Sequence, residues 1–546
     1  MSSLQTKFSQ LDHALSQFLS GRSQLIGDER QQLATIIQRL STQQASGDSC
    51  IPINEDERAL ILRSGLVNGD DVAPLVIEDE RLYLYRYWAY EERLATQIKT
   101  LIRSTADIDE SLLNRYFKLV SDLTDWQREA AHCVLSNSLT IITGGPGTGK
   151  TTTVVKIVAM LQEQAHSDGT PLNIALAAPT GKAAMRLQQS MAGSIDSLPC
   201  DSHIRESIPS KVSTIHRLLG AKRYSPYFRH RADNPLPHDL IVVDEASMVD
   251  LALMSKLVDA LKRDAKLILL GDRNQLASVE SGAVLADLIE ALPEQTAELK
   301  ESFRFDSSIK AVADGVNDQQ GEPMWGALQQ GLYPEVRLLN SSVIEQIIEK
   351  SLDYWQQIRD DAPFTEILAT FGKFQCLATN RVGPMGVIDI NRRVEERLAS
   401  TAFIEQNDIG AWYRGRPVIV TRNIRELGLF NGDIGITLAG DDGALRVYFE
   451  GTSENESRVR DFIPSRIPHC ETAYAMTVHK SQGSEFNEVL VLFPEVMNPV
   501  LTKELVYTAI TRAKKTVEIV VTKEIWLAAV GQRIARHSGL VVKLSP

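Results

Sequence analysis

A glycine-rich segment stands between an apolar run and a helical pattern, and its residue types are those that hold nucleotide phosphates. It reads Gly144-Gly145-Pro146-Gly147-Thr148-Gly149-Lys150-Thr151-Thr152. Glycines at this spacing let backbone N–H groups turn toward phosphates, and the start of the following helix adds the positive end of its dipole. We expect Lys150 to reach the β- and γ-phosphates of ATP and the Thr151 hydroxyl to bind Mg²⁺.

An acidic pair, Asp244-Glu245, follows the apolar run 240–243. Asp244 would hold Mg²⁺ directly or through water, and Glu245 would position and polarise the water that attacks the γ-phosphate. Such a pair is a weak signal alone, because helix N-termini attract carboxylates in any case. Together with the glycine-rich segment, it predicts ATP hydrolysis.

The elements that must position these residues are short apolar strands that alternate with helices. Four such runs predict a parallel sheet buried on both faces, in a first α/β domain over residues 119–292: 138–145, 173–180, 239–247 and 265–272. A second series predicts another α/β domain over residues 293–546: 371–379, 487–494 and 515–522. Inside it, Asn431-Gly432-Asp433 and Asp441-Asp442-Gly443 separate short strands, as hairpin turns do. We therefore expect a small inserted β-barrel at about 410–466.

Residues 1–118 are expected to form a mostly helical N-terminal domain without visible chemistry. Leu33, Ile36, Ile37 and Leu40 recur at the spacing of an amphipathic helix. The segment 83–90 concentrates Tyr and Trp. These rings either fill a small core or form an aromatic-rich surface for a partner subunit.

Composition narrows the class of protein. The 546 residues carry a net charge of −12 and contain five widely spaced cysteines. Zinc ribbons and disulfide scaffolds need clustered cysteines, so reduced thiols in a cytoplasmic protein are expected. We expect no signal peptide and no membrane span, because the start is polar and no run of 18 apolar residues occurs.

Further segments resemble the motifs of superfamily 1 helicases, in order along the chain. They are Trp126-Gln127-Arg128-Glu129-Ala130, Asp244-Glu245-Ala246-Ser247, Gly271-Asp272-Arg273-Asn274-Gln275-Leu276, Leu299-Lys300-Glu301-Ser302-Phe303-Arg304, the stretch 477–486, and Val506-Tyr507-Thr508-Ala509-Ile510-Thr511-Arg512-Ala513. The resemblance implies that Gln127 reads adenine and that Gln275 senses the γ-phosphate. It also implies that Arg304 and Arg512 are arginine fingers, which would otherwise be read as surface ion pairs.

A finer resemblance is to the RecD family, the α subunits of the bacterial RecBCD enzyme, exodeoxyribonuclease V. Segments 177–184, 214–220, 428–435 and 81–91 are similar to that family. The resemblance implies two RecA-like motor domains, a small SH3-like barrel insertion, ATP and Mg²⁺ as cofactors, and RecB-like and RecC-like partners. It implies a 5′→3′ DNA helicase in double-strand-break repair and recombination, with the N-terminal region contacting the RecC-like subunit.

The same resemblance assigns candidate DNA contacts to both motor domains. These are Thr180, Lys182, Thr214 and His216 in the first, and Thr477, His479 and Lys480 in the second. Hydroxyls and cations hold phosphates without reading sequence. For His216 and His479, a buried structural role remains open. The basic stretch 211–231 is either a solvated face or, with a small insertion at about 220–238, a hairpin that splits or guides DNA.

Two alternatives for the function remain. One is a free-standing RecD-like helicase, although such relatives usually carry extra N-terminal helix-hairpin-helix modules; the other is a scaffold with a relic nucleotide site. Nuclease chemistry is expected in a partner, because the fragment Glu298-Leu299-Lys300 is too short to indicate a nuclease. The net charge of −12 fits a DNA motor if cations are local to a groove, since a translocase must release its track in every cycle.

Overall fold

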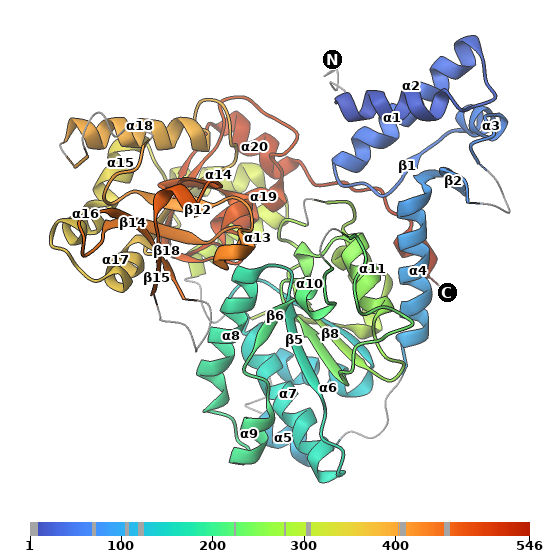
Figure 1. The fold of residues 1–546 in the computed structure, drawn as a ribbon, viewed down its shortest axis with the longest axis horizontal. Coiled ribbons are helices and arrows are strands. Elements are labelled where there is room, and N and C mark those ends of the chain that lie inside the picture. The colour runs from blue at the N-terminus through green and yellow to red at the C-terminus, as the bar shows by residue number, and fades with distance from the viewer. Residues whose placement is uncertain are drawn as a thin grey trace.

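The computed structural model describes residues 9–67, 72–103, 109–117, 125–222, 225–277, 280–301, 307–401, 403–404, 411–451 and 459–545. Figure 1 shows two large bodies, each built around its own sheet, and a group of N-terminal helices that stands apart from both. Among the described residues, no helix is long and apolar enough to cross a membrane. The five cysteines are all free.

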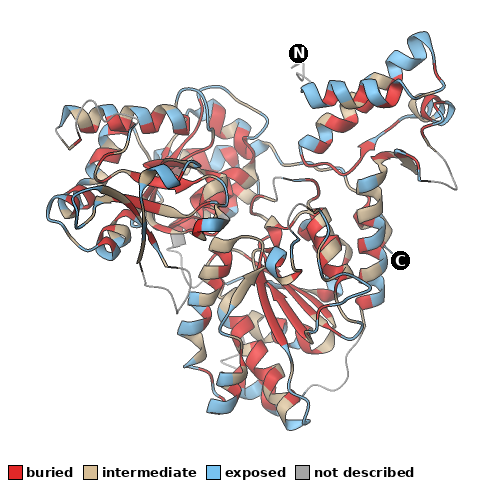
Figure 2. Cartoon of the chain, in the orientation of Figure 1, coloured by how far each residue is buried: buried red, intermediate tan, exposed pale blue. Residues whose placement is uncertain are grey.

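The first body is a six-stranded parallel sheet in the order β6-β5-β7-β8-β4-β9. Its strands are β4 (Leu139–Gly144), β5 (Ile174–Ala178), β6 (Val212–Thr214), β7 (Leu240–Val243), β8 (Lys266–Gly271) and β9 (Thr296–Leu299). Every residue of β4, β5 and β7 is buried, as the continuous apolar runs predict. Figure 2 shows this sheet as a buried layer between helices.

Helices cover both faces of that sheet. On one face, Ile142 and Ile268 pack in one apolar cluster with residues of α6 (Trp126–Ser136) and α7 (Lys150–Ser167). The cluster on the other face contains the residues that precede them in the strands, Ile141 and Leu267. Its helices are α4 (Tyr85–Leu101), α11 (Leu251–Asp259) and α12 (Val284–Ala291). Adjacent strand residues thus face opposite layers, which is the arrangement of a doubly covered sheet. Helices α5 (Glu110–Tyr116), α8 (Gly181–Ile195) and α9 (Ser202–Ser207) complete this body.

The second body is a five-stranded parallel sheet in the order β10-β19-β18-β11-β17. Its strands are β10 (Val336–Leu338), β11 (Phe374–Ala378), β17 (Ala475–Thr477), β18 (Phe486–Leu492) and β19 (Ala513–Val520). Its helices are α13 (Ser307–Asn317), α14 (Gly321–Gln329), α15 (Val343–Lys350), α16 (Leu352–Arg359), α17 (Phe364–Phe371), α18 (Val387–Ser400), α19 (Lys503–Ile510) and α20 (Lys523–Gly531). The three strands predicted after residue 293 are confirmed as β11, β18 and β19.

An antiparallel sheet is inserted between α18 and β17, in the order β15-β14-β13-β12-β16. It comprises β12 (Pro417–Val420), β13 (Ile434–Ala439), β14 (Leu445–Glu450), β15 (Val459–Phe462) and β16 (Cys470–Thr472). Both predicted turns join antiparallel strands, and Gly432 and Gly443 have positive φ at these turns. Glycine adopts this conformation without the strain that a Cβ would cause.

The N-terminal part contains α1 (Gln10–Ser20), α2 (Gly27–Ala45), α3 (Glu55–Arg63) and a small sheet of β1 (Ile51–Pro52), β3 (Arg81–Leu84) and β2 (Leu75–Glu78). The predicted stripe Leu33, Ile36, Ile37 and Leu40 is buried along α2. Tyr83 is fully buried, and Tyr87 and Tyr90 pack on the core of the first body. The core-filling interpretation is confirmed for Tyr83, whereas Tyr87 and Tyr90 are half-buried at the edge of that core.

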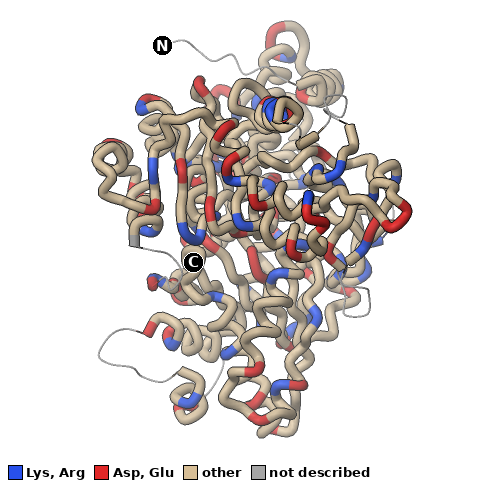
Figure 3. The backbone as a smooth tube through the Cα atoms, turned by 90° about the vertical axis from the view of Figure 1, so that its left-hand side faces the viewer, with Lys and Arg blue, Asp and Glu red and all other residues tan. Residues whose placement is uncertain are grey.

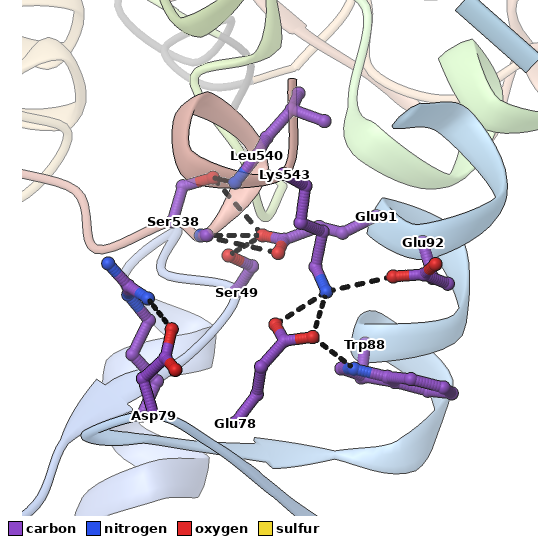
Figure 4. Close-up of polar contacts among 11 residues, drawn as sticks. Ser49, Glu78, Asp79, Trp88, Glu91, Glu92, Ser538, Leu540 and Lys543 are labelled. Atoms are coloured by element: carbon purple, nitrogen blue, oxygen red, sulfur yellow. Dashed lines mark hydrogen bonds and ion pairs between the residues drawn. The ribbon is translucent and has the colours of Figure 1, made fainter. Parts of the chain in front are cut away.

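A segment after α20, residues 532–545, crosses back from the second body to the first, and we call it the strap. Ile534 N–H donates to Glu504 in α19. Further along, His537 N–H donates to Asp48 (2.6 Å), and Ser49 N–H donates to the His537 carbonyl (3.0 Å). Figure 4 shows how Ser538 and Ser49 converge on the buried carboxylate of Glu91.

The strap ends in α21 (Leu540–Leu544), which completes the core of the first body. Leu540 and Leu544 are buried with Leu94 of α4 and Leu288 of α12. Lys543 donates to Glu78 and Glu92, and its ammonium lies 5.5 Å from the Trp88 ring centroid (Figure 4). The strap thus joins both bodies to the N-terminal part, which no sequence pattern indicated.

Candidate active site

The glycine-rich loop links β4 to α7, as its sequence predicts. Gly147 and Gly149 have φ near +80°, where an L side chain is strained, so these positions require glycine. The ammonium of Lys150 donates to the carbonyls of Gly144 (2.6 Å) and Gly145 (2.9 Å). The buried Thr148 hydroxyl also donates to Gly145 (2.9 Å). Lys150 therefore lies directly over the loop that would cradle the phosphates.

A cleft of about 660 Å³ opens over this loop, and both bodies line it. The predicted residues that line it are Gln127, Pro146, Gly147, Gly149, Lys150, Thr151, Thr152, Asp244, Glu245, Gln275 and Arg512. Gly144, Gly145 and Thr148 form the back of the loop instead. Arg304 lies outside the described residues.

The acidic pair follows β7 and faces Lys150 across the cleft. Asp244 N–H donates to Ala177 of the neighbouring strand β5 (2.9 Å), which fixes its position. Burial, with the charge of Glu245 adding to it, raises the pKa of Asp244 to about 6. Glu245 has φ +52°, a strained conformation for a residue with a side chain. The Asp244 carboxylate and the Thr151 hydroxyl line the same cleft, and such oxygen donors suit a divalent cation.

A buried hydrogen-bond chain joins the two bodies at the floor of the cleft. Gln275 Nε2 donates to Asp272 Oδ2 (3.0 Å), and the hydroxyl of Tyr507 in α19 donates to the same oxygen (3.0 Å). Beside them, Leu276 N–H donates to Thr508 Oγ1 (3.0 Å). The predicted γ-phosphate sensor, Gln275, therefore contacts the second body through Asp272.

Arg512 follows α19 and is only 2% exposed. Its guanidinium donates to the carbonyls of Thr508 (3.1 Å) and Ser484 (3.3 Å) while lining the cleft. The alternative of a surface ion pair is wrong for this residue, because it is buried. A planar guanidinium held in this way faces the phosphate site with a fixed orientation.

The candidate DNA contacts include two equivalent turns, one in each body. Thr214 ends β6, and its Oγ1 accepts the Arg217 N–H (3.2 Å) at the start of α10 (Ile215–Leu218). Thr477 ends β17, and its Oγ1 accepts the Lys480 N–H (3.3 Å). Each turn carries a histidine two residues after the threonine. Thr180 caps α8 in a similar way through the Ala183 N–H (3.2 Å).

The two histidines differ in exposure. His216 is exposed and lies edge-on to Phe228, with ring centroids 5.7 Å apart, so the buried structural alternative is wrong for it. His479 is half-buried, and burial lowers its pKa. The His479 ring is therefore mostly uncharged at neutral pH.

Both candidate lysines face a carboxylate. Burial lowers the pKa of Lys182 to about 8, while Asp433 of the inserted sheet acts in the other direction. Lys480 is paired with Glu471 of β16, and Glu471 also binds Arg381 (3.0 Å). Asp433 stands in the turn segment 428–435 and Glu471 in no recognisable motif, and the sequence did not indicate that either carboxylate lies near these lysines.

Within the basic stretch 211–231, isolated bridges pair Ala221 with Phe228 and Arg231 with Asn234. Arg231 is neutralised by Asp233 (2.5 Å). Tyr227 is exposed. Lys300, from the three-residue fragment that resembles nuclease sites, lies 4.4 Å from the centroid of the Trp126 ring.

Two parallel α/β bodies that share one phosphate cleft define a two-domain ATPase motor of the helicase type. Residues 127–281 match the AAA domain model AAA_19, and residues 472–520 match the UvrD-like helicase C-terminal domain. The chain is 40% identical over 471 residues to the RecBCD enzyme subunit RecD of Mycolicibacterium smegmatis, covering 85% of this chain and 82% of that protein.

Two other relatives have lower sequence identity to the chain. The RecBCD enzyme subunit RecD of Haemophilus influenzae is 33% identical over 536 residues, covering 86% of this chain and 81% of its own length. The ATP-dependent RecD2 DNA helicase of Deinococcus radiodurans is 30% identical over 499 residues, covering 90% of this chain and 61% of its own length. The chain belongs to the RecD family.

Proposed function

We propose that this protein is the ATP-dependent 5′→3′ DNA helicase and translocase subunit of a RecBCD-type helicase–nuclease, acting in double-strand-break repair and homologous recombination. The observation that carries the proposal is the shared cleft, in which Lys150, Asp244 and Glu245 of one body face Arg512 of the other. Family membership supports the same conclusion.

The chemistry follows from the placement of these residues. The N–H groups of the loop and Lys150 bind the phosphates, and Gln127 at the cleft wall lies where it can bind the base. Thr151 and Asp244 would hold Mg²⁺, which neutralises charge on the β- and γ-phosphates when bound. Glu245 orients and polarises the attacking water, and Arg512 stabilises the negative charge that develops on the transferred group, with Arg304 proposed as its companion.

DNA is proposed to run over the strand ends that carry Thr180, Thr214 and Thr477. The hydroxyls and His216 would contact phosphates, and His479 would add a neutral hydrogen bond. Lys480 is already paired with Glu471, so a phosphate must compete with that carboxylate to bind it, and the charge of Asp433 acts on Lys182. Figure 3 shows acidic and basic residues interspersed along the chain, without one dominant sign. Weak, exchangeable contacts suit a motor that releases its track in every cycle.

We also propose a domain organisation and partners. Residues 119–292 and 293–546 would be RecA-like domains, and about 410–466 an SH3-like barrel. Residues 1–118 would bind a RecC-like subunit in a complex with a RecB-like nuclease. Leu11, Phe18 and Ile26 support a docking role for this part, since they are 73%, 56% and 82% exposed. The cytoplasm is the proposed location.

One experiment separates the alternatives. The chain, alone and co-expressed with RecB-like and RecC-like subunits, is assayed for DNA-stimulated ATP hydrolysis and for unwinding of 5′- and 3′-tailed duplexes. We expect Lys150→Gln to abolish both activities, while Lys156→Gln on the same helix leaves them intact. Undiminished turnover by Lys150→Gln would contradict the site. Efficient unwinding by the monomeric chain would favour a free-standing helicase, and absence of ATP hydrolysis by the wild type would favour a scaffold.

A further inference from the structure

Helix α8 presents an arginine to the nucleotide cleft that no sequence motif indicated. Ala183, Arg186, Leu187 and Ser190 line the cleft from this helix. Their spacing places them on one face of the helix. Arg186 is the charged member of this face. It belongs to the first body, as Lys150 does, but it points to the side of the cleft that the second body closes.

In the structure, Arg186 is bound to a carboxylate of the second body. Its guanidinium lies 2.6 Å from Glu485, which follows the turn that carries His479. The carboxylate of Glu485 is only 9% exposed and also lies 3.6 Å from Lys514. The pair therefore links α8 to the loop 482–485, and Gly483 of that loop packs against Ala183.

The surroundings of Arg186 place it near the chemistry. Arg186 interacts electrostatically with Asp244 and with Arg512. Both groups line the same cleft. Arg186 thus shares one cleft with the acidic pair and the buried arginine, the groups proposed to surround the terminal phosphate.

We propose that Arg186 is a further phosphate-binding residue of the ATP site, which exchanges Glu485 for a terminal phosphate oxygen when nucleotide binds. The inference rests on the proposed ATPase function. A guanidinium presents a planar fork of donors that fits a carboxylate and a phosphate equally well, so the exchange preserves its hydrogen bonds. The exchange frees the loop 482–485 from α8, and nucleotide binding is thereby communicated to the second body.

A double-mutant cycle tests the exchange. The KM for ATP is measured for wild type, Arg186→Ala, Glu485→Gln and the double variant, all in the full chain with saturating single-stranded DNA. If Arg186 binds phosphate, Arg186→Ala raises KM by about tenfold or more, and the effect persists or grows in the Glu485→Gln background. If Arg186 serves only as an ion-pair partner, its effect disappears in that background, which would overturn the proposal.

Two further variants complete the design. Arg186→Lys retains the positive charge without the planar fork and should give an intermediate KM, so that the result does not depend on one truncation alone. Lys514→Ala removes the other cation beside Glu485 and should leave KM unchanged. An inactive wild type would contradict the proposed function itself, whereas an active wild type with an unchanged KM in Arg186→Ala would contradict only this inference.

Discussion

The phenolic hydroxyl of Tyr507 donates a 3.0 Å hydrogen bond to Asp272, and this buried contact joins α19 of the second body to the end of β8 in the first. The same carboxylate oxygen accepts the side-chain amide of Gln275 (3.0 Å). A residue that faces the nucleotide and a helix of the other body thus share one acceptor. If Gln275 moves when nucleotide binds, the hydrogen bond between Tyr507 and Asp272 changes as well, because both donors share one oxygen.

Tyr507→Phe tests this connection, because it retains the ring and removes only the hydroxyl. We expect ATP hydrolysis without DNA to stay within about threefold of wild type, since Asp272 keeps its bond to Gln275. The stimulation of hydrolysis by single-stranded DNA should fall about five- to tenfold, as for a coupling energy near 1 kcal/mol. Steady-state ATPase assays with and without DNA measure both numbers, and full stimulation in the variant would contradict a coupling role.

Arg512→Ala should lower kcat by about 10³-fold, the scale expected of an arginine finger, with KM for ATP changing less than about threefold. The reason is that the guanidinium stabilises negative charge on the γ-phosphate that is fully developed only in the transition state. Arg512→Lys should recover little activity, because an ammonium lacks the planar fork. Equal losses in kcat and in affinity would instead identify Arg512 as a ground-state binding residue.

Glu471→Gln should tighten binding of single-stranded DNA, because Lys480 and Arg381 lose the carboxylate that now occupies them. If both cations then bind phosphates, one to two contacts are added. The slope of log affinity against log salt concentration should become steeper by about 0.7 for each added contact. Fluorescence anisotropy at several salt concentrations measures this slope. An unchanged slope would show that these cations do not reach the DNA backbone.

The sequence was sufficient for the parts of the site whose chemistry is local. The glycine-rich loop, the acidic pair and Arg512 each belong to a short segment whose residue types carry its function, and the structure brings these segments into one cleft. Arg186 and Tyr507 contact partners about 235 to 300 residues away along the chain, so these contacts could not be predicted from local spacing, although Tyr507 stands in a segment that resembles a helicase motif. The strap was missed for the same reason. The segment around Leu540 is a short apolar run, and its role is visible only in the fold, where Leu540 packs with α4.

A pH dependence is expected where the strap meets α12. Burial raises the pKa of Asp287 from 3.8 to about 7, and the charges of Glu91 and Glu290 add to the increase. Between these values, the unfolded chain releases the proton and the folded chain keeps it, so stability falls as the pH rises toward 7 and is level above it. Asp287→Asn removes this loss. The advantage of the variant in melting temperature over wild type should therefore grow from pH 5 to pH 8, by about 2–4 °C for each kcal/mol of stability lost by the wild type; an advantage that does not change with pH would contradict the assignment.

Leu540→Ala tests the contribution of the strap to the first body. A buried leucine replaced by alanine costs about 2–5 kcal/mol, so the first body should unfold at a lower temperature. Hydrogen exchange should increase most in α4, which packs against Leu540. Val542→Ala on the same helix is the control, because Val542 is exposed and should change neither measurement. Equal effects of both variants would contradict a specific core role.

The position of α21 also constrains how the protein is made. The leucines that close the core between α4 and α12 are translated more than 430 residues after α4 itself. While the ribosome is still synthesising the second body, the first therefore carries an open apolar seam, and the seam closes only after α21 has left the exit tunnel. A nascent chain that stops before α21 keeps that seam exposed to chaperones and proteases.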